Sequence, residues 1–519
     1  MGAPVSLLGN ARAFARDFPR DRMPQGYLWD VVDYVPTIID ASLTGRGGWQ
    51  WGSTALSGDV ESGIYAPFSN GDKLLVQTAD GRLFEVSLAS PYTATDRGAL
   101  PRSKQNPVQL VDTVVHFDMT SSMSPRLITN PGGVPTVGAI ATGHKNAPVG
   151  AAFKSMLITA GAPGELNVIR FSDPQKALTD PASYVDNSFY ATSLPIAAIA
   201  ALRSVILIFH DGSVERIRGA TPAHGTAVGD MILEPLFDRA GCIDPQSIAY
   251  WNDNCLFADA HGVHITDGSV IRNLVSQGGI LYYWRQLYEN KIAPIAGCTF
   301  LDYYICTLRR SDSVYVTLIC DLNRRQWVRF TNILAYCYIA SSGGSTMERV
   351  WAGMSGKARL ARIAPCFFPT FSTATIQDDD GSAVLPVLET PWYRLGQEGR
   401  KRVRFGYLSY DVRTGAPTRD GVPSGWRFGG EETGVPPEDG VAATVASQIL
   451  QVGYIRSPQQ ASYTTIGTLP DTADYRRYRL PLGQNPYGLA FKVTQLLPST
   501  VTRIFDLAVE AQAGERSRT

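Results

Sequence analysis

Short apolar runs separated by polar turns recur along most of the chain, and helical periodicity is almost absent. One such unit places apolar runs at residues 74–78 and 83–87, on either side of Asp80 and Gly81. We expect a β-hairpin here. The Asp-Gly pair predicts a type I′ turn, because both central residues of that turn need positive φ.

The same hairpin pattern returns further along the chain, and each copy is centred on a short polar turn. The clearest copies lie at residues 205–217, 255–265 and 303–320, and further hairpins fit at residues 108–129, 151–171 and 350–363. Apolar runs such as residues 195–201 and 292–297 precede them, and more polar segments follow.

An apolar strand, a hairpin and a more polar outer strand make a four-stranded unit. Such units stacked radially form a β-propeller. We therefore predict an all-β fold with a propeller of six or seven irregular blades between Trp49 and Pro365. An open array of sandwiches stays open as an alternative. A β-helix fits the long spacing and the antiparallel hairpins less well.

Beyond Pro365 the pattern of apolar and polar residues changes. Residues 400–411 alternate polar and apolar side chains as a half-buried strand does, and residues 475–481, 488–493 and 504–512 are similar. A stretch rich in Gly, Pro and Glu at 414–440 predicts a long loop. We expect three parts: an extended N-terminal arm (1–48), the propeller (49–365) and a C-terminal β-sandwich (366–519).

The charge composition narrows the function classes. The chain has 519 residues, 47 Lys and Arg balance 47 Asp and Glu, and charged residues make up only 18%. Disorder requires low hydrophobicity and high net charge, so it is excluded. Binding to nucleic acid mainly through phosphates would require an excess of basic residues. A surface poor in charge tends to associate with other subunits.

The cysteines and apolar segments bear on the compartment. Seven cysteines lie between Cys242 and Cys366 without a C-x-x-C pair, and we interpret them as small buried hydrophobic residues in a reducing compartment. The N-terminus has no signal-peptide pattern. The longest apolar run, 195–209, contains Arg203 and is too short to span a bilayer, so we expect synthesis in the cytoplasm and no membrane insertion.

Neighbouring carboxylates are the first candidates for catalysis. They occur at residues 378–380 and at Glu431-Glu432, both in glycine-flanked stretches. General acid–base catalysis needs carboxyl groups held apart in a structured cleft, so we interpret both groups as solvated turns. Neither the Ser-x-Asp-x-Gly-x-Thr-Trp box of sialidases nor a Gly-x-Ser-x-Gly elbow occurs. The stretch Gly161 to Gly164 lacks the lysine of a phosphate-binding loop.

One histidine pair raises the question of a metal. His261 and His264 lie close together, between Asp259 and Asp267. Residues three apart on a strand point to opposite faces, so a shared metal would need a distorted turn. We favour a polar hairpin and predict no catalytic, cofactor-binding or metal-ligating residues.

Basic residues gather on two predicted C-terminal strands. Arg400, Arg402 and Arg404 would share one strand face, and so would Arg477 and Arg479 on the later strand. The simplest interpretation is a solvated or partner-facing sheet surface. The functional alternative is contact with passing DNA or with an acidic subunit.

The N-terminal block is the most distinctive part of the sequence. It reads Ala15-Arg-Asp-Phe-Pro-Arg-Asp-Arg-Met-Pro-Gln-Gly-Tyr-Leu-Trp-Asp-Val-Val-Asp-Tyr-Val-Pro36, then Gly45-Arg-Gly-Gly-Trp-Gln-Trp-Gly-Ser53. An extended arm ending in a Gly-Gly-Trp turn before a run of hairpins resembles structural proteins of tailed bacteriophages. It looks like the β-propeller tail proteins of the nozzle or hub, or minor tail proteins in an equivalent position. Residues 171–184, 202–219, 400–411 and 475–482 fit the same resemblance.

The resemblance implies a virion component that is made in the cytoplasm of a bacterial host. Copies of the chain would form a ring around the tail axis and contact adjacent tail or head-tail connector proteins. DNA would pass through the lumen during ejection, with transient non-specific contact at most. The family's motifs carry no catalytic residue, so the resemblance implies a structural protein without a cofactor.

Two other functions stay open. A propeller could be a carbohydrate-binding or glycan-active receptor-binding protein, whose aromatic side chains would line a sugar pocket. It could also be a cellular scaffold, although the Trp-Asp repeat signature of that class is absent from the sequence.

Overall fold

The structure is a computed structural model of the chain. It describes residues 5–6, 13–17, 22–23, 27–36, 43–103, 105–120, 122–222, 229–311, 314–341, 349–367, 378–379, 382–390, 393–394, 401–413, 448–455, 462–470, 476–484, 488–495 and 501–513.

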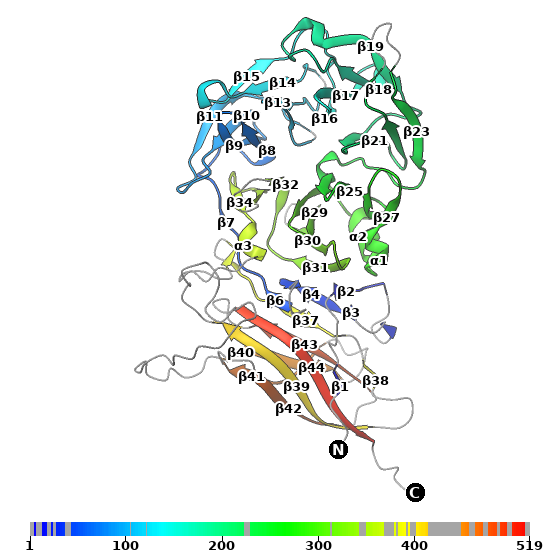
Figure 1. The fold of residues 1–519 in the computed structure, drawn as a ribbon. Coiled ribbons are helices and arrows are strands. Elements are labelled where there is room, and N and C mark those ends of the chain that lie inside the picture. The colour runs from blue at the N-terminus through cyan, green and yellow to red at the C-terminus, as the bar shows by residue number, and fades with distance from the viewer. Residues whose placement is uncertain are drawn as a thin grey trace, which may run out of the picture.

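Six separate four-stranded antiparallel sheets form a β-propeller, seen face-on in Figure 1. Blade 1 is β8 (Val60–Phe68), β9 (Gly71–Thr78), β10 (Arg82–Val86) and β11 (Ala94–Ala99); blade 2 is β12 (Val108–Leu110), β13 (Thr113–His116), β14 (Arg126–Thr129) and β15 (Thr136–Ala139). Blade 3 is β16 (Val149–Phe153), β17 (Met156–Ala162), β18 (Glu165–Ser172) and β19 (Tyr184–Ala191); blade 4 is β20 (Ala198–Ala201), β21 (Val205–Phe209), β22 (Val214–Arg218) and β23 (Ile232–Phe237). Blade 5 is β24 (Ala249–Trp251), β25 (Asn254–Asp259), β26 (Gly262–Thr266) and β27 (Ile271–Asn273); blade 6 is β32 (Ala335–Ala340), β33 (Val350–Met354), β34 (Leu360–Arg362) and β7 (Gln50–Trp51).

A further four-stranded meander stands between blades 5 and 6. It consists of β28 (Ala296–Phe300), β29 (Tyr303–Ser311), β30 (Val314–Asp321) and β31 (Gln326–Phe330). This meander is the beginning of a ten-stranded sheet rather than a separate blade. The predicted all-β propeller is therefore confirmed, with six separate blades and this meander completing the ring.

The polarity gradient across each blade explains why the pattern was visible in the sequence. Middle strands such as β21 pack against neighbouring blades on both faces and are buried along their whole length. Outer strands such as β11 and β15 have mostly exposed or half-exposed residues. A strand buried on both faces is uniformly apolar, whereas an outer strand can be polar.

Apolar contacts between blades close the ring. Phe209 of blade 4 lies 4.7 Å from Phe257 of blade 5, measured between ring centroids. Cys337 and Ile339 of blade 6 pack in one buried cluster with Val60 of blade 1. The last blade is completed by β7 from the N-terminal part of the chain, since Trp51 pairs with Ala361.

The ten-stranded sheet connects the propeller to the C-terminal part of the chain. Beyond β31 it continues through β4 (Asp30–Val32), β37 (Val387–Glu389), β43 (Gly488–Gln495), β40 (Gln448–Ile455) and β41 (Thr464–Pro470), and β38 (Tyr393–Arg394) pairs with β43. A six-stranded sheet contains β42 (Arg476–Gln484), β39 (Lys401–Arg413), β44 (Val501–Ala513), β6 (Leu43–Gly45), β5 (Tyr34–Pro36) and β1 (Val5–Ser6). Two-stranded pairs are β2 (Ala13–Phe14) with β3 (Tyr27–Leu28), and β35 (Asp378–Asp379) with β36 (Ser382–Ala383).

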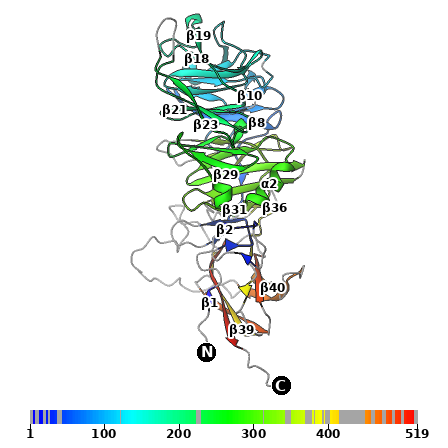
Figure 2. The ribbon, with the colours of Figure 1, turned by 90° about the vertical axis from the view of Figure 1, so that its right-hand side faces the viewer.

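The N-terminal strands therefore pair within their own chain. Strand β4 lies between β31 and β37, and β6 pairs with β44. Figure 2 shows the propeller edge-on, with the C-terminal strands and both chain ends on the side away from the upper blades. The antiparallel C-terminal strands agree with the expectation from sequence, while the extended arm and the sandwich stay predictions. The predicted loop at 414–440 lies outside the described residues.

One local expectation is wrong, the type of the turn in the first hairpin. In the first hairpin Gly81 has positive φ (79°), but Asp80 does not, so the turn is not type I′. The N–H of Gly81 donates to the carbonyl of Thr78 at 2.9 Å, which places the glycine at the fourth position of the turn instead of the third. The hairpins at 205–217 and 255–265 are confirmed as β21–β22 and β25–β26.

Three short helices were not predicted. They are α1 (Leu274–Gln277), α2 (Leu281–Glu289) and α3 (Ala364–Phe367). The carboxylate of Asp17 accepts hydrogen bonds from the backbone N–H groups of Leu281 and Tyr282, at 2.6 and 2.7 Å. Because these donors have no partner within the helix, a residue more than 260 positions away stabilises the start of α2.

Candidate functional site

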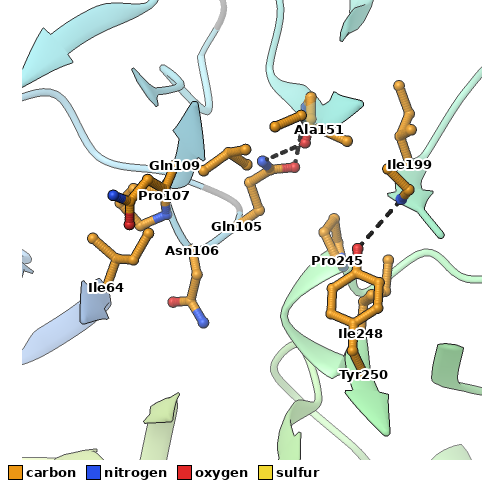
Figure 3. Close-up of a pocket in the computed structure, with 14 residues that line it drawn as sticks. Ile64, Gln105, Asn106, Pro107, Gln109, Ala151, Ile199, Pro245, Ile248 and Tyr250 are labelled. Carbon is orange, nitrogen blue, oxygen red and sulfur yellow. Dashed lines mark hydrogen bonds between the residues drawn. The ribbon is translucent and has the colours of Figure 1, made fainter. Parts of the chain in front are cut away.

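A cavity of about 400 Å³ lies where the inner strands of blades 1 to 5 converge (Figure 3). It is lined by Ile64, Gln105, Asn106, Pro107, Val108, Gln109, Gly150, Ala151, Ala152, Ile199, Ala201, Pro245, Ile248 and Tyr250. Because five blades contribute to it, the closed ring positions every wall. This volume is within the usual range of small-molecule sites.

Small side chains on two inner strands make room for the cavity. Strand β16 contributes Ala152, and β20 contributes Ala201. Gly150, also on β16, is required for a separate reason: a Cβ atom there would lie 2.4 Å from both the Phe117 ring and the carbonyl oxygen of Ile158. The runs Val149-Gly-Ala-Ala and Ala198-Ile-Ala-Ala are visible in the sequence, but neither run by itself indicates that its small side chains line a cavity.

Three amide side chains line the cavity, those of Gln105, Asn106 and Gln109. Gln109 donates to the carbonyls of Pro67 and Val111 at 2.8 and 3.1 Å. Gln105 and Asn106 instead each make one donor and one acceptor bond with the backbone. Gln105 donates to the carbonyl of Gly150 at 2.9 Å and accepts from the N–H of the same residue at 3.2 Å. Asn106 accepts from Gly63 N–H at 3.2 Å and donates to the carbonyl of Tyr338 at 2.9 Å. These bonds fix the orientation of the Gln105 and Asn106 amides without using their full hydrogen-bonding capacity.

Tyr250 supplies an aromatic surface to the cavity. Its hydroxyl accepts a hydrogen bond from the N–H of Ala201 at 3.3 Å, which fixes the ring against the next blade (Figure 3). The residue is nevertheless 49% exposed. Among the described residues that line the cavity, none carries a carboxylate, amine, guanidinium or imidazole. The chemistry of this site is therefore that of neutral hydrogen-bonding groups and apolar surface.

A hydrogen bond crosses the ring beside the cavity. The side chain of Gln246, just before β24 of blade 5, donates to the carbonyl of Glu61 in blade 1 at 2.6 Å. Blade 6 and the β28–β31 meander stand between these two blades on one side of the ring. The bond therefore links opposite walls of the ring and restricts changes in the distance between them.

The expectation for residues 378–380 is wrong for Asp379. Its side chain is not solvated: the residue is 2% exposed and its carboxylate receives the guanidinium of Arg46, which is completely buried. Arg46 also donates to Asp33 at 2.7 Å and to the carbonyl of Thr331 at 2.8 Å. A buried carboxylate needs a charged partner, and here that partner comes from the distant N-terminal block.

The pKa shifts follow from this burial. Burial alone would lower the pKa of Arg46, but the carboxylates of Asp33 and Asp379 outweigh it and raise that pKa well above its ordinary value. Burial raises the pKa of Asp379, and Arg46 offsets only part of that effect. The cluster joins three parts of the chain, because Arg46 bonds to Asp33, Thr331 and Asp379. Asp380 and Glu431-Glu432 lie outside the described residues.

Asp259 lies beside both histidines of the considered metal site. Nε2 of the buried His264 is 2.8 Å from one of its carboxylate oxygens, and Nδ1 of the exposed His261 is 3.7 Å from the other. Asp267 instead accepts backbone N–H groups from Ser269 and Val270. Burial alone would raise the pKa of Asp259, but hydrogen bonds, first that with His264, hold it below its ordinary value. Across the described ranges, no three His, Cys, Asp or Glu side chains are grouped so that they could hold a metal ion.

The cysteines are a further feature that the sequence analysis interpreted. All seven cysteines are free and buried, which confirms their interpretation as core residues.

On the basic strands, Ser409 of β39 is opposite Arg477 of β42, and Tyr407 is opposite Arg479. Arg402 and Arg404 belong to β39, while Arg400 lies outside the described residues.

Two sequence comparisons, with protein families and with curated proteins, give no match. In the part of the chain that the structure describes, no helix has the length and apolar character needed to cross a membrane. The function must therefore be argued from the sequence resemblance and from the geometry.

Proposed function

We propose that this chain is a structural protein of a tailed-bacteriophage virion, located in the nozzle, hub or tail-tip ring. It acts by assembly with copies of itself and with adjacent tail or head-tail connector proteins. The assembled ring forms part of the conduit through which DNA leaves the particle. In this role the chain needs neither a catalytic residue nor a cofactor.

The observation that carries the proposal is the position of the N-terminal block. This block bears the sequence resemblance, and it supplies strands to three different sheets: β4 to the ten-stranded sheet, β5 and β6 to the six-stranded sheet, and β7 to blade 6. Arg46 and Asp33 of the same block form the buried ion cluster. Because this block joins three sheets of the chain, it suits a protein with a structural role in an assembly.

The chemistry of the axis also favours assembly over catalysis. Propeller hydrolases need acid and base groups at the axis, but the residues that line the described cavity are neutral. The balanced net charge of the chain suits a conduit through which DNA slides, because a strongly basic lumen would retain it.

The proposal includes finer features of the architecture. The six-stranded sheet and the C-terminal half of the ten-stranded sheet would face each other as a β-sandwich. Buried side chains on β40 and β43, including Val452, Tyr454 and Phe491, supply one apolar face for such packing. Residues near the N-terminus would extend to a neighbouring subunit, and the basic strands β39 and β42 would face a partner or passing DNA.

Two measurements test the proposal together. Mass spectrometry of purified phage particles should detect this chain, and negative-stain images of the purified protein should show rings of several copies. Light scattering over a range of protein concentrations should give a mass that is a multiple of 56.4 kDa. A protein that stays monomeric at every concentration and is missing from the particles would contradict the proposal.

A carbohydrate-binding protein is the second candidate function. The specific observation in its favour is the neutral axial cavity with the half-exposed Tyr250 ring. Glycan-array binding by a protein that neither forms rings nor occurs in virions would favour this second candidate. The two functions are compatible, because a tail protein can also contact the host surface.

A further inference from the structure

We propose that the axial cavity is a binding site for a neutral saccharide of one or two rings. The inference does not rest on assembly into a virion, because it concerns one propeller by itself. It follows from the size of the cavity, its lack of charge, its two oriented amides and its exposed aromatic ring.

Size and charge define the class of ligand. A volume of about 400 Å³ admits a small organic molecule but not a folded partner. A phosphate, a carboxylate or an amine would meet no compensating charge on the lining residues that the structure describes. Removing an unpaired charge from water costs far more than removing a neutral polar group. The cavity therefore discriminates against ions.

The two amides match the hydroxyl groups of a sugar. An amide side chain offers two N–H donors and two acceptor sites. Gln105 and Asn106 each use one donor and one acceptor in bonds to the backbone, so each amide retains one N–H donor and one acceptor site. A sugar hydroxyl both donates and accepts, so it can bond to the remaining donor and acceptor. Because the backbone already orients these amides, little entropy is lost when a ligand binds them.

Tyr250 supplies an aromatic ring at the cavity. Its ring is an apolar surface against which the C–H groups of a pyranose ring can pack. Its hydroxyl accepts from Ala201 and still has its own hydrogen to donate. Figure 3 shows Tyr250 on the side of the cavity across from Gln105 and Asn106, so a flat ligand between them contacts both kinds of group.

A purely apolar ligand fits these observations less well. It would cover the remaining donors and acceptors of the amides without replacing their bonds to water, and a polar group left unsatisfied in this way weakens binding. A sugar offers apolar C–H faces and hydroxyl edges at the same time. The mixture of Ile64, Val108 and Ile199 with the two amides suits that double character.

The test uses the full-length protein and defined sugars. Saturation-transfer NMR and calorimetry are recorded with glucose, maltose, cellobiose, lactose and diacetylchitobiose, with glucuronic acid as an anionic comparison matched in size to glucose. We expect at least one neutral sugar to bind with millimolar or better affinity, and glucuronic acid to bind at least tenfold more weakly than that sugar. No binding by any of these sugars up to 20 mM, or equal binding of the anionic sugar, would overturn the inference.

Variants then locate the site. Tyr250→Ala removes the aromatic surface, and Ala152→Leu fills the cavity; each should weaken binding at least tenfold. Ala99→Leu is the matched control, because Ala99 is exposed on the outer strand β11, away from the axis; it should bind as the unchanged protein does. Circular dichroism and thermal melting establish that each variant is folded. If both cavity variants fold and bind normally, the sugar binds elsewhere and the inference is wrong. Ring formation is measured on the same samples, so the proposed virion role is judged separately.

Discussion

Replacement of Arg46 by alanine should destabilise the protein more than any change of a surface arginine. The guanidinium is completely buried and bridges Asp33 and Asp379, which are each 2% exposed. Removal of Arg46 leaves the two carboxylates without their charged partner and the carbonyls of Gly47 and Thr331 without its N–H donors. Breaking a buried ion pair in this way costs about 3–5 kcal/mol of unfolding free energy.

The cost should depend on pH in a defined direction. Without Arg46, the Asp379 carboxyl has a folded-state pKa raised above its unfolded value, because burial opposes its ionisation. Such a group stabilises the folded state at low pH and loses that contribution as the pH rises through its folded pKa. The difference between Arg46→Ala and the unchanged protein should therefore be largest at pH 7 and smaller at pH 5.

Urea unfolding followed by tryptophan fluorescence measures this difference. Arg82→Ala is the matched control, because Arg82 forms a solvent-exposed pair with Asp96 and its loss should cost at most about 1 kcal/mol. In a double-mutant cycle, Arg46→Ala with Asp379→Ala should cost about 1–3 kcal/mol less than the sum of the single changes. Equal stability of Arg46→Ala and Arg82→Ala at pH 7 would refute the reasoning.

Three further predictions concern the propeller. Gly150→Ala should lose about 1–3 kcal/mol in urea unfolding because its Cβ meets the Phe117 ring. Gly138→Ala should be nearly neutral, because its Cβ would make only an ordinary contact with the carbonyl oxygen of Leu127 at 3.9 Å. Burial lowers the pKa of His116 to about 4, so the unfolded chain takes up a proton near pH 6.5 and the folded chain only near pH 4. The free energy of unfolding should therefore fall by about 3 kcal/mol as the pH is lowered from 6.5 to 4. In urea titrations His116→Gln should make this fall smaller. All seven thiols are buried, so a thiol reagent should modify none of them rapidly in the folded protein and all seven in urea.

The sequence predicts the propeller well because its signal is local. A middle strand such as β21 is apolar throughout, and the turn after it contains Gly212 with positive φ (86°). Both features depend on residues close together in the chain, and they repeat in several blades. Repetition therefore compensates for uncertainty about any single hairpin.

The parts that were not predicted depend on distant partners. Asp379 has the local surroundings of a solvated turn, and only Arg46, 333 positions away, makes it a core residue. Helix α2 is likewise capped by Asp17. The axial cavity arises where small residues of two blades meet amides of a third, so no single segment indicates it. Propensity and spacing do not contain information about such pairings.

The closing strand shows how these distant contacts stabilise the ring. Strand β7 has only two residues, and two paired positions are too few to hold a blade together by themselves. Its anchorage comes from the residues before it: Arg46 is bound to Asp379, the N–H of Trp49 donates to the same carboxylate at 3.0 Å, and the indole of Trp49 donates to the carbonyl of Asn332 at 3.1 Å. Loss of Arg46 should therefore release β7 before the rest of the propeller unfolds. Hydrogen exchange would detect this as faster exchange at β7 and β34 with unchanged protection in β21, and uniform acceleration of all blades would show instead that the ion cluster stabilises the fold only globally.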